Sequence, residues 1–177
     1  SGVVSYTVMT YVYNLVLMAF VGIAQGCQPL VSYAVGQQDS KTIKLVYRYG
    51  LTAVALTSVL CFGGCWIFTP QIVSVFIRPQ ETALFGSTVA AFRLYSFCFL
   101  IMGYNVLTSG FFVALAKPKA ALTLSLARGI VVILACLLAM SSAFGALGIW
   151  LTPTVSEGLC LILSFILLIK AKSWAAA

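Results

Sequence analysis

The sequence contains no histidine, and only three of its 177 residues are acidic. Histidine is the commonest general base and the commonest metal ligand in proteins, so its absence removes both roles at once. The six cysteines lie in apolar stretches without a paired C-x-x-C spacing, and there is no glycine-rich phosphate loop. These absences argue against an enzyme, a zinc site and a disulfide framework, and we expect no bound cofactor.

Charge is scarce along the whole chain. Charged residues make up 7% of the sequence and hydrophobic residues 62%, with a mean hydropathy of +1.11. Soluble domains carry about 25% charged residues. A soluble domain of this size could not bury so many apolar side chains in its core, whereas a lipid bilayer can surround them. The net charge of +7 comes from short basic clusters between apolar segments, so it predicts orientation in a membrane and not nucleic-acid binding.

Five runs of about twenty apolar residues predict an all-α fold, a polytopic bundle of transmembrane helices. The predicted spans are residues 8–35, 46–68, 89–115, 122–140 and 149–169, within a single transmembrane domain of residues 1–177. Polar, glycine-rich or proline-rich turns separate the spans. The segment 71–78 is too short to cross a bilayer, and we interpret it as a surface connection with room for a short interfacial helix.

Basic residues mark one side of the predicted bundle. If the spans alternate in direction, one side carries Lys41, Lys44, Arg48, Lys117, Lys119, Lys170 and Lys172. The other side carries Arg78 and Arg93. The positive-inside rule then places the first side in the cytoplasm together with the C-terminus, in a multi-pass protein of the plasma or inner membrane. An odd number of spans that starts outside, with no signal peptide, also predicts further chain before Ser1.

Two predicted spans carry polar faces that lipid would disfavour. The first span aligns Asn14, Gln25 and Gln28 on one face of a helical wheel. The third span aligns Tyr95, Met102, Asn105 and Ser109. The second set suits flat hydrophobic cations, because aromatic faces attract cations and methionine adapts its shape. Each face either packs against a neighbouring helix or lines a pathway for substrate or ions, and the sequence leaves both readings open.

Glu157 is the only acidic residue inside a predicted span. It lies about 13 Å below the outer end of the fifth span, where Pro153, one turn earlier, is expected to bend the helix. Carboxylates inside a membrane are proton or cation sites by default, so Glu157 is the main candidate for ion coupling. The alternative is a structural ion pair with Arg128, the only basic residue well inside a span. For Arg128 itself we favour snorkelling toward the inner headgroups.

Residues 22–36, GIAQGCQPLVSYAVG, resemble the G-x-x-x-G-x-Q-P-x-x-x-Y-x-x-G segment of the multidrug and toxic compound extrusion (MATE) family. Residues 75–78, 112–119 and 146–153 are similar to that family's outer connection, the inner loop after its tenth helix and the start of its last helix. The match covers nearly the whole chain and implies helices eight to twelve of a twelve-helix transporter. For the intact transporter, the resemblance implies efflux of hydrophobic organic cations in exchange for H⁺ or Na⁺. Gln28 and Glu157 are its candidate cavity or cation residues.

The family's two-lobed architecture implies a partner besides the lipid bilayer, either a missing N-terminal lobe or a second chain. Since alternating access needs a second lobe, we expect no transport from this chain alone. Two alternative functions stay open. A lipid-linked oligosaccharide flippase of the same superfamily would need a more cationic cavity for its pyrophosphate. A non-transporting assembly subunit would pack the faces around residues 25–28 and 105–109 tightly against protein.

Overall fold

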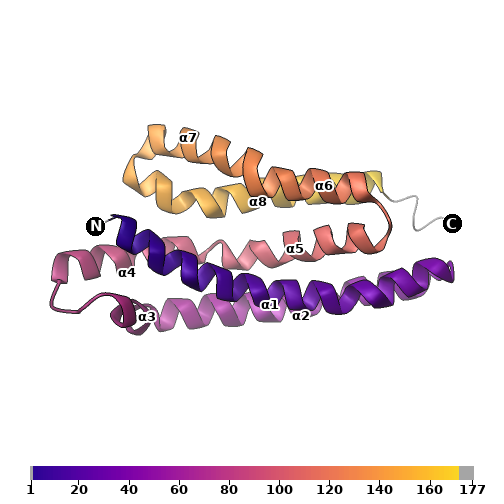
Figure 1. Ribbon diagram of the computed structural model, residues 1–177, viewed down its shortest axis with the longest axis horizontal. Coiled ribbons are helices and arrows are strands. Elements are labelled where there is room, and N and C mark those ends of the chain that lie inside the picture. Colours follow the sequence, from indigo (N-terminus) through magenta and orange to yellow (C-terminus); the bar gives the residue numbers. More distant parts are fainter. Residues whose placement is uncertain (1, 172–177) are drawn as a thin grey trace.

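The computed structural model describes residues 2–171, and within that range the chain is a bundle of helices without strands (Figure 1). The helices are α1 (Gly2–Gly36), α2 (Ser40–Ile67), α3 (Thr69–Phe76), α4 (Thr82–Ser96), α5 (Phe99–Ala114), α6 (Pro118–Leu126), the π-helical turn η1 (Ala127–Val131), α7 (Val132–Phe144) and α8 (Ala146–Lys170). Four stretches are long and apolar enough to cross a membrane, namely α1, α2, α6 through α7, and α8, and α4 with α5 makes a fifth if that bent pair is one span. The predicted all-α membrane fold is confirmed. Ser1 and Lys172, two residues of the topology argument, lie outside the described range.

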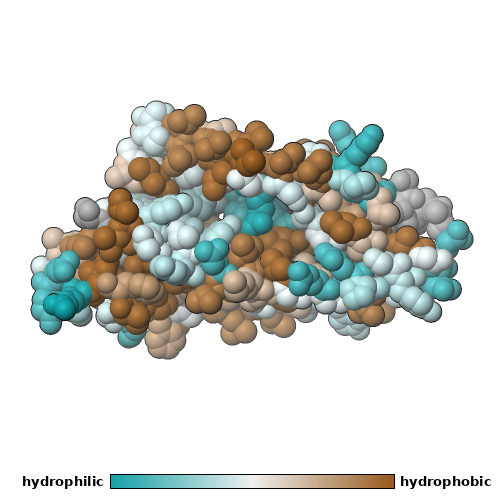
Figure 2. Space-filling model, in the orientation of Figure 1, coloured by the Kyte–Doolittle hydropathy of each residue, from teal (hydrophilic) through white to brown (hydrophobic). Residues whose placement is uncertain are grey.

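Few residues of the spans are fully buried inside the protein. In the most apolar window of each continuous span, only 17–28% of the residues are buried inside the bundle. Figure 2 shows the consequence, a surface that is largely hydrophobic along its length with hydrophilic residues gathered at both ends. Such a surface is stable in lipid, where each helix satisfies its own backbone hydrogen bonds.

The helices pack in two groups that α8 joins (Figure 1). In the first group, α1, α2 and α5 contact one another; in the second, α7 packs along α8, which also contacts α4 and α5. The first group packs together with α4 through large buried side chains such as Phe20, Phe92 and Phe99. A methyl group built at Gly103 would lie 2.5 Å from the Phe20 ring, so only glycine allows α1 and α5 to approach this closely.

The turn between α1 and α2 has clear local causes. Gln38 adopts a left-handed backbone conformation with φ 56°, and Asp39 then caps α2 by accepting the backbone N–H groups of Lys41 and Thr42, each at 3.1 Å. The Thr42 hydroxyl also donates to this carboxylate. Hydrogen bonds from the side chain and backbone of Thr42 lower the pKa of Asp39, so the cap stays charged at neutral pH.

The third predicted span, residues 89–115, is not a continuous helix, because α4 and α5 meet at a 42° bend. No proline lies at the bend. Instead the backbone tightens there, with Cys98 N bonding Tyr95 O at 3.1 Å and Ile101 N bonding Cys98 O at 3.1 Å, three residues back instead of four. The Ser96 hydroxyl donates to the Arg93 carbonyl, which competes with the regular helical bond at the same place.

The connection after the second span contains a short helix, as the sequence analysis allowed. It is α3, which begins after Phe68, carries Pro70 in its first turn and buries Val73. Proline suits this position because the first N–H groups of a helix have no intrahelical partner.

Candidate functional site

A buried carboxylate, Glu157 of α8, lies at the centre of a polar network. Its Oε1 accepts a hydrogen bond from Arg128 Nε of η1 at 2.9 Å, which forms an ion pair. Its Oε2 accepts a bond from Asn105 Nδ2 of α5 at 2.7 Å, and the same amide donates to the Glu157 backbone carbonyl at 2.9 Å. Glu157 is 4% exposed and Asn105 is fully buried. Both carboxylate oxygens therefore have protein partners, as a charge inside a membrane requires.

The network continues to two further residues at its ends. Arg128 Nη2 donates to the Tyr13 hydroxyl of α1 at 3.1 Å, and the Ser164 hydroxyl of α8 donates to Asn105 Oδ1 at 2.9 Å. We call Tyr13, Arg128, Glu157, Asn105 and Ser164 the ion-pair network. It connects α1, α5, η1 and α8, so it joins the two helix groups through polar contacts.

Sequence reasoning did not identify Tyr13 or Ser164. For Ser164 a signal existed, because it lies seven residues after Glu157 and therefore on the same face of α8, two turns further along. Nothing local singled out Tyr13 among the tyrosines of the chain. Its role depends on a contact with η1, which is far away in the sequence.

Snorkelling of Arg128 toward the headgroups, the interpretation favoured above, is wrong. The side chain is 22% exposed and bonds to both Glu157 and Tyr13. Because the guanidinium and the carboxylate neutralise each other inside the bundle, neither has to reach the membrane surface. Arg128 also lies in η1, a π-helical turn that the sequence did not predict, and such turns within α-helices are frequent at functional sites.

A cavity of about 200 Å³ with several polar side chains in its lining lies beside the network. It is lined by Tyr6, Thr10, Tyr13, Asn14, Tyr95, Arg128, Ile133, Pro153, Ser156 and Glu157. Two predicted pathway residues, Asn14 and Tyr95, thus share one cavity with the predicted Glu157, although they come from α1, α4 and α8. Figure 2 shows a hydrophilic recess near the middle of the largely apolar face, between the two helix groups.

Asn105 belongs to the ion-pair network but does not line this cavity, and the other four predicted pathway residues lie outside both. Gln25 is exposed on α1, and Gln28 lines a narrow crevice against α2 and α5. Met102 is fully buried in the core of the first helix group, and the Ser109 hydroxyl is 3.1 Å from that of Ser125. For all eight predicted residues, the assignment to a pathway for substrate or ions stays a prediction.

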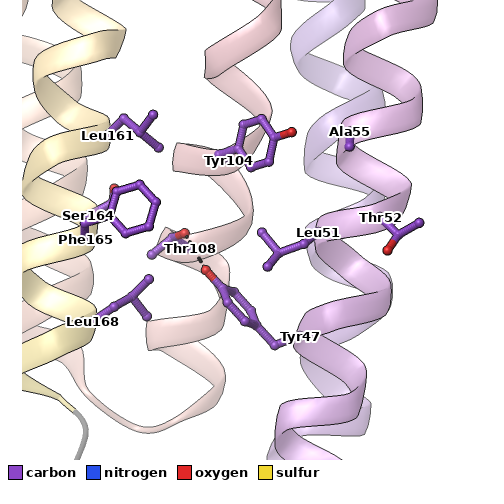
Figure 3. Close-up of a pocket in the computed structure, with 10 residues that line it drawn as sticks. All are labelled: Tyr47, Leu51, Thr52, Ala55, Tyr104, Thr108, Leu161, Ser164, Phe165 and Leu168. Carbon is purple, nitrogen blue, oxygen red and sulfur yellow. Dashed lines mark hydrogen bonds between the residues drawn. The ribbon is translucent and has the colours of Figure 1, made fainter.

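An apolar cavity of about 480 Å³ opens between α2, α5 and α8 (Figure 3). It is lined by Tyr47, Leu51, Thr52, Ala55, Tyr104, Thr108, Leu161, Ser164, Phe165 and Leu168. The hydroxyls of Tyr47 and Thr108 form a hydrogen bond of 3.1 Å with each other across its wall. Ser164 belongs both to this wall and to the ion-pair network, so the two features are adjacent. The sequence did not predict this cavity, whose walls come from three helices.

Comparison with known proteins identifies the fold. A crystal structure described as a MATE in complex with MaL6 matches with a TM-score of 0.90 at 16% identity, over 99% of this chain and 40% of that chain. The outward-facing conformation of a multidrug resistance MATE family transporter of the MOP superfamily gives the same values. An inward-facing conformation of such a transporter matches with a TM-score of 0.83, over 96% of this chain and 40% of that chain.

These similarities cover the two sequences unequally. The chain spans only 40% of the length of each of these transporters, and at 16% identity the likeness shows the fold. No curated protein matches the chain. The sequence model of the MatE family, however, matches residues 1–138, which is well over half of the chain. On this match, and with the fold in agreement, the chain belongs to the MATE family.

Proposed function

We propose that the chain forms most of the C-terminal lobe of a multidrug efflux transporter, which exchanges hydrophobic organic cations for H⁺ or Na⁺ by alternating access. The observation that carries this proposal is the ion-pair network, in which the buried Glu157 of α8 bonds to Arg128 of η1 and Asn105 of α5. Charged groups inside a membrane are expensive, and they mark ion and proton pathways more often than they serve stability. The 40% coverage of the similar transporters supports a second lobe outside this chain.

The network offers a physical route from ion binding to movement. A proton added to Glu157 removes the negative charge that holds the Arg128 guanidinium, so the contact between η1 and α8 weakens. A sodium ion would act similarly by competing for the carboxylate oxygens. Because the partners Tyr13 and Asn105 belong to α1 and α5, a change at one carboxylate alters the packing of several helices together. An ion is coupled to transport when its binding changes the relative stability of two arrangements of the helices.

The apolar cavity supports the proposal of a hydrophobic substrate. Its volume of about 480 Å³ lies within the range of pockets that hold drug-sized molecules. Tyr47, Tyr104 and Phe165 give it aromatic surfaces, which attract organic cations. The flippase alternative has no comparable support in the middle of the bundle, since the positive charge of Arg128 is offset by Glu157 and the cavities there carry no excess positive charge for a pyrophosphate.

We predict that Glu157→Gln lowers efflux of a cationic dye by about tenfold in the complete transporter, a size typical of coupling between two sites. The substitution keeps an oxygen that accepts from Asn105, but it removes the negative charge and leaves the Arg128 guanidinium without its carboxylate. Efflux is measured in cells over a series of external pH values, with the amount of protein in the membrane determined in parallel.

The matched control for this experiment is Glu81→Gln. Glu81 is exposed, precedes α4 and caps no backbone group with its side chain, so the same chemical change there removes a charge outside the network. We expect its efflux to equal that of the unchanged protein. Equal efflux from Glu157→Gln at every pH and at equal abundance would contradict the coupling role and leave the carboxylate a structural one.

We also propose that the turn between α1 and α2 faces the cytoplasm and that the connection after α3 faces out, on the distribution of basic residues. Cysteines at Gln37 and Gln80, both exposed, test this. Gln37 is preferred to Gln38 because of the left-handed backbone at Gln38. In a version without native thiols, we expect the cysteine at Gln80 to react with an impermeant maleimide on whole cells, and the one at Gln37 only after lysis. The reverse pattern would invert the proposed orientation.

A further inference from the structure

A basic cavity lies at the end of the molecule where α6 begins and α8 ends. Its volume is about 430 Å³, and three lysines line it, Lys117, Lys119 and Lys170. Its other walls are apolar and include Ala120 and Leu167. The lysines come from the two ends of different helices, so the fold gathers positive charge that the sequence spreads over more than fifty residues. None of the residues that line this cavity belongs to the ion-pair network.

One lysine is fixed in place by the fold. Lys117 Nζ donates a hydrogen bond of 3.2 Å to the carbonyl of Ala171, just after the last turn of α8. Lys117 also precedes α6, whose first residue is Pro118. The partial positive charge of that helix start adds to the positive charge of the lysines. The ammonium group is thus held against the wall of the cavity with donors left for a ligand.

The three lysines have no acidic partner within residues 2–171. The ion pair found in that range joins Arg128 to Glu157. Asp39 is occupied with capping α2, and Glu81 lies near the start of α4, at the opposite end of the molecule (Figure 1). Three lysines that lie together without an acidic partner favour the binding of an anionic ligand from outside the chain.

The position of the cavity narrows the class of ligand. It lies where α6 begins and α8 ends, at the ends of two stretches long and apolar enough to cross a membrane, and this is where we expect lipid headgroups to meet water. Its lysines can face a phosphate while Ala120 and Leu167 continue as an apolar wall toward the bilayer interior. Basic pockets between transmembrane helices are known to bind anionic headgroups. We propose that this cavity binds one anionic phospholipid, with its phosphate among the three lysines and an acyl chain along Leu167.

The proposal is tested by lipid binding to the purified chain in micelles of zwitterionic detergent. Phosphatidylglycerol, phosphatidylcholine and inorganic phosphate are titrated separately, and retained lipid is counted by native mass spectrometry. We expect one phosphatidylglycerol to be retained in preference to phosphatidylcholine. The triple substitution Lys117→Gln, Lys119→Gln and Lys170→Gln should weaken its binding by at least about tenfold, since each basic side chain near an anionic headgroup contributes on the order of fivefold.

The chain offers a control with the same change in charge. Lys41→Gln, Lys44→Gln and Arg48→Gln remove three positive charges at the same end of the molecule, on α2 and outside the cavity. We expect this variant to retain the lipid. Replacing the three cavity lysines by arginine should also preserve binding, and circular dichroism confirms that each variant keeps its helices.

Three outcomes would overturn the proposal. If both triple glutamine variants lost phosphatidylglycerol binding equally, the lipid would be attracted by the overall positive charge at this end of the molecule and not by a defined site. Retention of phosphatidylcholine as well as phosphatidylglycerol would exclude selection of an anionic headgroup. Displacement of the lipid by millimolar inorganic phosphate alone would identify a site for free phosphate.

Discussion

Replacing Arg128 by methionine is expected to lower the free energy of unfolding by about 3–5 kcal/mol, the cost of leaving one partner of a buried ion pair alone. The substitution keeps an apolar stem of similar length in η1 but removes both the bond to Glu157 and the bond to Tyr13. Unfolding by SDS in mixed micelles, followed by circular dichroism, measures the change. The substitution thus removes two polar contacts between helices, one to α8 and one to α1.

The double substitution Arg128→Met with Glu157→Gln separates charge from packing. It removes the unpaired carboxylate while an amide at this position still bonds Asn105, so we expect it to recover most of the lost stability. Arg78→Met is the control, because Arg78 is exposed in the connection after α3, and it should change stability by less than about 0.5 kcal/mol. A double variant as unstable as Arg128→Met alone would show that the loss comes from packing of the arginine stem.

Gly148→Ala is expected to destabilise the pair of helices α7 and α8 by about 3 kcal/mol or more, at the upper end of overpacking effects. A methyl group at this position would lie 1.9 Å from the Met140 carbonyl oxygen and 2.4 Å from its carbon. Both atoms belong to backbone, so no side chain can rotate away and the helices must separate. The same unfolding assay measures the stability, and hydrogen exchange of the amides around Gly145 reports whether the turn between α7 and α8 opens.

The same helix supplies the control, Gly158→Ala. Nothing lies within 4 Å of a methyl group there, and Gly158 is within α8. This substitution should be neutral or stabilising by up to about 1 kcal/mol, because alanine favours the helix over glycine. If the two alanine variants had equal stability, the close crossing of α7 and α8 at Met140 would be incorrect.

The sequence predicted the candidate site only in part, and particular residues show why. Glu157 stood out because an acid in an apolar run is costly wherever the helix lies, which is a local property. Helical periodicity predicted that Asn14, Tyr95 and Asn105 lie on polar faces of their helices. Periodicity shows which residues share a face but not what that face contacts. The prediction for Arg128 is wrong because its side chain can extend either to a lipid headgroup or to a carboxylate. Which of the two it contacts depends on Glu157, a partner 29 residues away.

The sequence by itself determined that lipid is the solvent of this protein and which stretches are long and apolar enough to cross it. Hydropathy over about twenty residues decides whether a helix is more stable in lipid than in water, and that sum needs no knowledge of neighbouring helices. Only the tertiary structure decided that Arg128 meets Glu157, that α4 and α5 bend apart, and that a cavity opens between α2, α5 and α8. These features depend on distances between helices, and such distances are set by close packing at points such as Gly103 and Gly148.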